Sequence, residues 1–280
     1  MTYKISTITI TASLNIIVDL DVFYKNISII PHEDETINRD GFTYIEYGKK
    51  KEALTHCKGF HKKLTIARRK KKMGKRFDNQ ATVIVRTFID DKYEQANLKI
   101  FKNGNIQMTG VKSINHGNMI LDYIVEIFKT MNTEECMILS IENINITNFK
   151  IQLINSDFKI GYNIKREKLY KLIHKDHPDV FCSFEPCIYP GVKIQFLIEE
   201  TGKKVTIAVF RSGCVIITGA QELEETKRAY TFIHGILVNN KTEIEMVSAF
   251  DQSVNDPLKN KKKKKRDTLI IPEGYVLDAY

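Results

Sequence analysis

The side chains best placed to bind a metal ion are His56, Cys57 and His61, because closely spaced histidine and cysteine are typical zinc ligands. A structural zinc site needs four ligands, and no fourth lies at suitable spacing. The sequence also lacks a nucleophile–base pair and a phosphate-binding glycine loop. We therefore predict no metal, no cofactor and no enzymatic activity, and expect the function to be non-covalent binding.

Basic side chains suited to binding phosphate are concentrated in two segments. The formal net charge is +9, but residues 49–76 hold thirteen basic side chains and one acid, and residues 259–266 hold seven and none. The other residues hold 23 basic and 33 acidic side chains, a net charge of −10. The two segments are typical of DNA-backbone contacts, of a nuclear import signal in the tail, or of a solvated loop and tail.

Composition also restricts the compartment. No stretch of about 18 apolar residues is present, so we expect no membrane-spanning helix. Met1 opens onto a segment without the charged and apolar regions of a signal peptide. The five cysteines are scattered and odd in number, which favours free thiols in a reducing intracellular compartment.

An internal repeat dominates the sequence. Residues 98–112 align with residues 207–221 without a gap, so that Phe101 matches Phe210 and Thr109 matches Thr218. Each copy has an apolar strand, an Asn-Gly or Ser-Gly turn and a second strand, the pattern of a β-hairpin.

The elements around the hairpins repeat as well. An apolar spacing of three and four residues predicts a helix after each hairpin. Runs of β-branched and aromatic residues predict strands before each hairpin. The expected strands are Ile5–Val18, Ala81–Ile89, Phe149–Ile160 and Val192–Ile198, and a short helix is expected at Leu169–Ile173. The fold class is thus α+β, with helices on one face of each sheet and the other face open to solvent or a partner.

The repeated frame resembles the TATA-box-binding protein family. The second copy has Val209–Ala220, similar to the family's Ser-Gly turn followed by Val-x-x-Thr-Gly-Ala, and Phe184–Gly191, similar to its Tyr-Glu-Pro-Glu-Leu-Phe-Pro-Gly segment. The resemblance implies a saddle of two pseudo-symmetric repeats that form a curved antiparallel sheet with helices on the convex face. The expected domains are repeat 1 at 1–132 with a basic insertion at about 32–76, repeat 2 at 148–240, and a lysine-rich extension at 241–280. The departures from the family look more like a large DNA virus's version than a cellular one.

The resemblance also implies a DNA interface with aromatic wedges. TATA-box-binding proteins are themselves the reference example of apolar wedges and kinked duplexes in minor-groove binding. The wedges fall on Phe101, Phe210 and Tyr189. For the first wedge of repeat 1, ungapped alignment gives Gln80, whereas a three-residue insertion gives Phe77, which we favour.

Further interface residues follow from the same alignment. Several floor positions depart from the family: Lys99 and Gln107 replace apolar residues, and the paired central asparagines fall on Thr9 and Leu153. These changes put a strict A·T preference in doubt. The remaining floor positions are Thr11, Thr109, Asn155, Ile216 and Thr218, and the expected phosphate contacts are Arg86, Lys102, Lys112 and Arg211.

The resemblance implies a transcription initiation factor that binds and bends double-stranded promoter DNA through the minor groove. It would recruit general transcription factors and the RNA polymerase machinery through Glu185, Pro186 and Ile188. The expected location is the nucleus, or a cytoplasmic viral factory if the protein is viral. The alternative is an interaction scaffold that kept the fold and binds DNA without regard to sequence.

Overall fold

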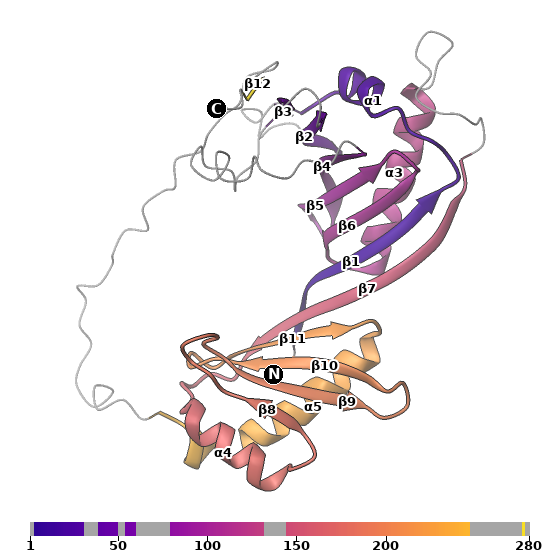
Figure 1. The fold of residues 1–280 in the computed structure, drawn as a ribbon. Helices are drawn as coiled ribbons and strands as arrows, with labels where there is room; N and C mark the ends of the chain where they lie inside the picture. The colour runs from indigo at the N-terminus through magenta and orange to yellow at the C-terminus, as the bar shows by residue number, and fades with distance from the viewer. Residues whose placement is uncertain are drawn as a thin grey trace. The chain divides into compact units, whose positions relative to one another are not determined.

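The computed structural model describes residues 3–30, 39–49, 54–59, 79–131, 144–246 and 276–277. The chain forms two compact units. The repeat-1 unit comprises Thr9–Lys150 and Lys265–Tyr280, and the repeat-2 unit comprises Met1–Ile8 and Ile151–Lys264. Two long strands, β1 (Lys4–Leu14) and β7 (Ile146–Lys159), contribute residues to both units (Figure 1). Each unit therefore includes the end of a strand that opens the other repeat.

The repeat-1 sheet has the strand order β12-β3-β2-β4-β5-β6-β1. Two helices, α1 and α3, complete this unit. The bounds are α1 Leu20–Asn26, β2 Gly41–Lys49, β3 Leu54–Gly59, β4 Gln80–Ile89, β5 Lys92–Phe101, β6 Asn105–Val111, α3 Ile114–Met131 and β12 Val276–Leu277.

The repeat-2 sheet has the order β7-β11-β10-β9-β8. Its helices are α4, α5 and the single turn α6. The bounds are α4 Arg166–Asp176, β8 Phe181–Ser183, β9 Val192–Ile198, β10 Lys203–Val209, β11 Cys214–Ala220, α5 Leu223–Asn239 and α6 Lys241–Ile244. The strand pairs β8–β9, β9–β10, β10–β11 and β11–β7 are antiparallel.

The duplicated hairpin predicted from the sequence is confirmed as β5–β6 and β10–β11. Gly104 and Gly213 lie at the two turns with φ of 78° and 74°. A Cβ atom at either position would also collide with a backbone carbonyl oxygen, that of Ile16 or Tyr162. Both turns therefore require glycine for its conformation and for its lack of a side chain.

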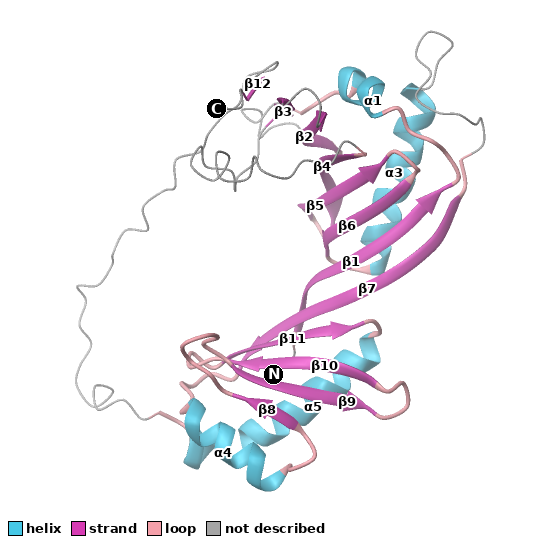
Figure 2. Ribbon diagram, viewed as in Figure 1, coloured by secondary structure: helices cyan, strands magenta, loops and turns pink. Residues whose placement is uncertain are grey.

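The helices cover one face of each sheet, as the apolar spacing predicted (Figure 2). On α3, Ile120, Ile124 and Phe128 are fully buried, and the Phe128 ring meets Phe23 edge-on at 5.4 Å between centroids. On α5, Ile233 and Leu237 are likewise buried. Burying each such side chain stabilises the fold by roughly 1.5–3 kcal/mol, which fixes the helices on this face and leaves the other open. The α+β fold class is confirmed.

Part of the expected insertion belongs to the repeat itself. Within residues 32–76, β2 pairs with β4 as β8 pairs with β9, so β2 occupies in repeat 1 the place of β8 in repeat 2. The strand β2 has nine residues, whereas β8 has three. The run Phe42–Tyr47 is rich in aromatic and β-branched residues, which favour a strand, but the basic residues that follow it are typical of an insertion. The strand β3, which pairs with β2 and β12, extends the sheet further.

Two helices differ from the expectation. The short helix at Leu169–Ile173 extends over Arg166–Asp176. The helix α1 was not predicted, because its seven residues are too few for a clear apolar period. Its signal was Asp19, whose carboxylate accepts the backbone N–H groups of Asp21 and Val22 at 3.0 and 3.1 Å, an N-cap.

Candidate nucleic-acid interface

The face of the repeat-1 sheet opposite its helices is lined by partly exposed side chains. Along β5, Leu98 and Ile100 are fully buried, whereas Lys99 and Phe101 are half-buried on the opposite face. Lys99 pairs with Gln107 across the β5–β6 ladder, so the two polar side chains lie side by side. We call this surface the open face of repeat 1.

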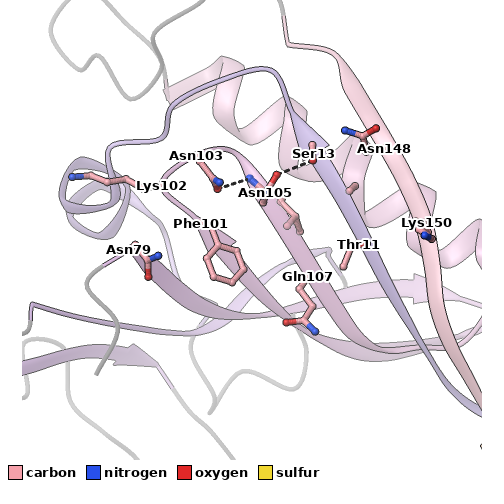
Figure 3. A pocket seen from close by; sticks show the side chains of 12 residues that line it. Thr11, Ser13, Asn79, Phe101, Lys102, Asn103, Asn105, Gln107, Asn148 and Lys150 are labelled. Atoms are coloured by element: carbon pink, nitrogen blue, oxygen red, sulfur yellow. Dashed lines mark hydrogen bonds between the residues drawn. The ribbon is translucent and has the colours of Figure 1, made fainter. Parts of the chain in front are cut away.

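A hollow of about 720 Å³ lies on this open face around Phe101. Figure 3 shows Phe101 and Gln107 within it, with Lys102 at one side and Lys150 at the other. The other lining residues are Thr11, Ala12, Ser13, Asn79, Asn103, Asn105, Ile106 and Asn148. The structure thus brings together four residues expected from the sequence: Thr11, Phe101, Lys102 and Gln107.

Thr109, which was expected on this face, donates its hydroxyl to the carbonyl of Asn97 at 3.4 Å. Sequence reasoning missed the hydrogen bond from the Ser13 hydroxyl to the Asn105 side-chain carbonyl at 2.7 Å. Ser13 and Asn105 are both polar, and the alternation of side chains along β1 and β6 was the sequence signal that could have placed them on this face. Most of the residues that line the hollow are therefore threonine, serine, asparagine, glutamine or lysine, and they surround one aromatic ring.

The first wedge of repeat 1 has two candidate residues, of which the structure describes only one. Phe77, the favoured one, lies outside the described residues. Gln80 pairs directly with Phe101 in the β4–β5 ladder. In repeat 2 the last pair of the corresponding ladder joins Val192 to Val209, so Tyr189 lies before the start of β9. Gln80 therefore lies within a paired strand, unlike Tyr189, because the β4–β5 ladder has ten residue pairs and the β9–β10 ladder has seven.

The aromatic pair of repeat 2 is fully described. The rings of Tyr189 and Phe210 meet at 5.8 Å between centroids, edge to face. A Cβ atom at Gly191 would lie 3.0 Å from the Tyr189 ring and 3.2 Å from the Phe210 ring, so the missing side chain lets the two rings approach. Arg166 supports the same loop by donating to the Pro190 carbonyl and lying over the Phe184 ring.

The segment before this pair projects the expected partner-binding residues. The amides of Ile188 and Tyr189 both donate to the carbonyl of Glu185 at 2.9 Å, which closes a turn after Pro186. The Ile188 side chain is 80% exposed. This turn therefore presents an apolar side chain to solvent.

The open face of repeat 2 carries a different set of polar groups. Ile216 pairs with Ala208 on one side and with Asp157 on the other. Thr218 lies two residues after Ile216 on β11, and its hydroxyl donates to the side-chain carbonyl of Asn155. Ile216, Thr218 and Asn155 thus share one face, as expected, together with Asp157, which was not expected there.

Matching backbone hydrogen bonds show how the first strands of the two repeats correspond. The Leu14 amide donates to the Gly104 carbonyl, and the Ile160 amide donates to the Gly213 carbonyl, each at 2.9 Å. Because the two glycines occupy the same turn position of the repeated hairpin, Leu14 corresponds to Ile160.

This correspondence corrects the expected pairing of Thr9 with Leu153. Counted back along β1 and β7, Thr9 corresponds to Asn155, and Leu153 corresponds to Thr7. The two residues are therefore not equivalent positions, because the expected alignment set the first strand two residues out of register. Of these four positions only Asn155 is asparagine, so neither pair of equivalent positions is a pair of asparagines.

The expected phosphate-contacting residues differ in their surroundings. Lys102 and Arg211, each next to a wedge phenylalanine, are exposed. Arg86 lies over the Tyr93 ring at 4.6 Å and donates to the Arg39 carbonyl at 3.2 Å, and Lys112 is 3.9 Å from a Glu94 carboxylate oxygen. Of the four side chains, Lys102 and Arg211 are therefore the exposed ones, whereas Arg86 and Lys112 are partly buried.

An equivalent pair of buried groups holds each hairpin to its helix. In repeat 1 the amide of Lys112 donates to His116 Nδ1 at 3.2 Å. In repeat 2 the amide of Gln221 donates to the Glu225 carboxylate at 2.7 Å. His116 and Glu225 occupy the same place in the aligned repeats, and both are buried.

The two groups have different electrostatics. Burial lowers the pKa of His116, and the nearby Glu94 carboxylate opposes this shift without cancelling it. The accepted amide fixes the proton on Nε2, which lies 2.7 Å from the Thr87 hydroxyl. Burial alone raises the pKa of Glu225, but hydrogen bonds from the Gln221 and Glu222 amides and the charge of Lys203 outweigh it, so this pKa is lowered.

The residues considered as metal ligands do not form a described site. Cys57 is buried, and His56 lies against the Tyr24 ring at 5.7 Å. His61 lies outside the described residues, as do 60–78 and 247–275, which hold sixteen of the twenty basic side chains of the two basic segments. Within the part of the chain that the structure describes, no group of three acidic, histidine or cysteine side chains is arranged to hold a metal ion. None of the described helices is long and apolar enough to span a membrane.

Comparisons with known proteins agree with this fold. The family model described as "Transcription factor TFIID (or TATA-binding protein, TBP)" matches residues 148–240. A "TATA-box-binding protein-like" protein of Acanthamoeba polyphaga mimivirus is 32% identical over 261 residues, covering 87% of this chain and 67% of that protein. This confirms the expected likeness to a viral protein.

Cellular relatives match a smaller share of this chain. The Entamoeba histolytica "TATA-box-binding protein 2" is 29% identical, covering 51% of this chain and 59% of that protein. The "TATA-box-binding protein" of Dictyostelium discoideum is 30% identical, covering 49% and 58%. The solved structure of the Methanococcus jannaschii TBP superposes with a TM-score of 0.50 at 18% identity, covering 85% of this chain and 99% of that one, which shows the common fold.

Proposed function

Because this chain belongs to the TATA-box-binding protein family of transcription factors, we propose that it is an initiation factor that binds double-stranded promoter DNA in the minor groove. The open faces of both repeats make the contact. The observation that carries this proposal is the duplicated pairing of an aromatic side chain with an exposed cation, Phe101 with Lys102 and Phe210 with Arg211.

The chemistry of these faces suits a bent minor groove. An aromatic edge inserted between base pairs costs a few kcal/mol of unstacking per step, which the contact of sheet and groove offsets. Tyr189 and Phe210 are already in contact before any DNA binds, so the wedge needs little rearrangement. Lys102 and Arg211 beside the wedges supply phosphate contacts that place the aromatic rings.

The second part of the proposal concerns partners. The exposed Ile188 and the Glu185-Pro186 turn form a surface for another initiation factor or the polymerase machinery. Glu185→Arg should weaken capture of the cognate initiation factor without changing DNA affinity. Unchanged capture would remove this surface from the proposal.

The direct test is a binding and bending titration on doubly labelled duplexes with A·T-rich centres at low salt. We expect saturable binding with a change in end-to-end distance. A chain that neither binds nor bends any duplex under these conditions is not a DNA-binding initiation factor.

A scaffold that binds DNA without regard to sequence is the second candidate, favoured by the polar Lys99–Gln107 pair on the floor of repeat 1. It predicts salt-sensitive binding carried by residues 49–76 and 259–266. Deletion of 49–76 would also remove β3, so neutral substitutions in the two basic runs are the better variant. Bending that survives neutralisation supports the initiation factor, and loss of all binding supports the scaffold.

A further inference from the structure

An acidic side chain, Asp157, lies on the open face of repeat 2, where the proposed function places DNA. It pairs with Ile216, while the neighbours of Ile216 along β11, Val215 and Ile217, are fully buried on the helix side. Because side chains alternate along a strand, the Asp157 carboxylate points to the same face as Ile216. Its side chain is 28% exposed.

Two contacts hold the carboxylate in place. The Ser6 hydroxyl donates to Oδ1, and the Lys4 ammonium lies 3.6 Å from Oδ2. Since Lys4 is 76% exposed, this ion pair contributes little to stability. It does offset the negative charge of Asp157 on a face that would meet a polyanion. A carboxylate has about four acceptor positions, so these contacts leave others open.

The chemistry of the minor groove gives this acceptor one complementary partner. A·T and T·A pairs present only acceptors there, and the guanine 2-amino group is the sole base donor. A carboxylate accepts hydrogen bonds and donates none. Opposite an A·T pair the Asp157 carboxylate would lose water, gain no hydrogen bond from the base pair and be repelled by its acceptor atoms.

We infer that Asp157 is a specificity-determining residue that selects a G·C pair in the minor groove by accepting a hydrogen bond from the guanine 2-amino group. This inference rests on the proposed function. It makes the preferred site asymmetric, with a G·C requirement under repeat 2 that the first repeat does not impose.

The equivalent position in repeat 1 shows the contrast. Asp157 corresponds to Thr11, and Lys4 corresponds to Lys150. Thr11 and Lys150 belong to the repeat-1 unit, and both line the hollow around Phe101. A threonine hydroxyl donates as well as accepts, so it tolerates the acceptors of an A·T pair. On repeat 2 itself, Asn155 accepts the Thr218 hydroxyl and keeps its amide NH₂ to donate to such acceptors. Asp157 is thus a local exception on a face otherwise compatible with A·T pairs.

The experiment begins with selection of bound duplexes from a random-sequence pool by the full chain. Each selected guanine is then replaced singly by inosine, which lacks only the 2-amino group. At one position this should weaken wild-type binding on the order of tenfold to a hundredfold, the range for hydrogen bonds to a charged group. Replacing adenine by 2,6-diaminopurine in an A·T variant of that position should restore most of the affinity.

Variants of the protein separate Asp157 from general charge effects. Asp157→Thr introduces the repeat-1 residue, and Asp157→Asn keeps the shape while adding donors. Both should lose most of the inosine effect. The control Asp176→Asn removes an exposed acid at the end of α4 and should keep the full effect. Thermal unfolding of each variant shows whether the fold is retained.

The outcomes distinguish this inference from the proposed function. If the selected sites bind but tolerate inosine everywhere, or if a folded Asp157→Thr or Asp157→Asn keeps the inosine effect, Asp157 does not select guanine while the DNA-binding function stands. If no duplex is enriched or bound, the result contradicts both the proposed function and the inference about Asp157.

Discussion

The buried imidazole of His116 should make the repeat-1 unit sensitive to mild acid. Its Nδ1 accepts the Lys112 amide, and its Nε2 proton faces the Thr87 hydroxyl. Protonation of Nδ1 removes the acceptor for that amide and places a charge in a buried site. The substitution His116→Gln keeps an acceptor and a donor of similar reach but cannot titrate. Comparing it with the wild type therefore isolates the ionisation.

The lowered pKa of His116 sets the sign and the size of this change in the free energy of unfolding. The unfolded chain takes up this proton near the ordinary pKa of 6.5, whereas the folded chain resists it. The stabilisation is thus complete above pH 6.5 and is lost as the pH falls through the folded pKa. One titrating group changes the free energy of unfolding by at most about 1.4 kcal/mol per pH unit. Between pH 6.5 and 5.5 the wild type should lose up to this amount relative to His116→Gln.

Urea unfolding at pH 7.5, 6.5 and 5.5, combined with amide hydrogen exchange along α3, measures this effect. Glu225→Gln is the matched control in repeat 2, because the pKa of Glu225 is lowered from 4.5 and its titration lies below this window. That variant should keep the wild-type pH slope. Equal slopes for the wild type and His116→Gln, or a wild type that gains stability on acidification, would refute the reasoning.

Three further results are expected. Gly191→Ala, whose Cβ would crowd the aromatic pair of repeat 2 at 3.0–3.2 Å, should reduce DNA bending in a resonance-energy-transfer assay while circular dichroism stays unchanged. Glu225→Ala leaves two backbone amides and Lys203 without their acceptor, so it should lower the free energy of unfolding in urea by about 2–4 kcal/mol. The exposed Cys187 should react with a thiol reagent at pH 8 well before the buried Cys182, because burial raises the pKa of Cys182 to about 11.

The repeated hairpins and their helices could be predicted because the signal was local and duplicated. The glycine turns at Gly104 and Gly213 and the apolar period of α3 and α5 each follow from a few neighbouring residues. The helix α1 and the strand β8 were missed because seven and three residues carry too little pattern. The strand β2 was missed because the charge of the segment after it outweighed its own aromatic residues in the interpretation.

The site could be predicted in kind but not in detail. Phe101, Phe210, Gln107 and Ile216 were expected on the open faces from the family resemblance, and alternation along β5 put Lys99 on the face of Phe101. Asp157 was overlooked although it lies two residues after Asn155 on β7, where alternation puts both side chains on one face. Its pairing with Ile216 of β11 is a tertiary register, which needs the folded sheet.

The central claim is that the aromatic side chains of the open faces, rather than the basic side chains alone, shape the bound DNA. The most direct measurement compares DNA bending by Phe210→Ala and Arg211→Ala on one doubly labelled duplex at saturating protein. The account predicts that Phe210→Ala loses most of the bend, whereas Arg211→Ala bends normally and only needs more protein to saturate. Equal bending by Phe210→Ala and the wild type would contradict it.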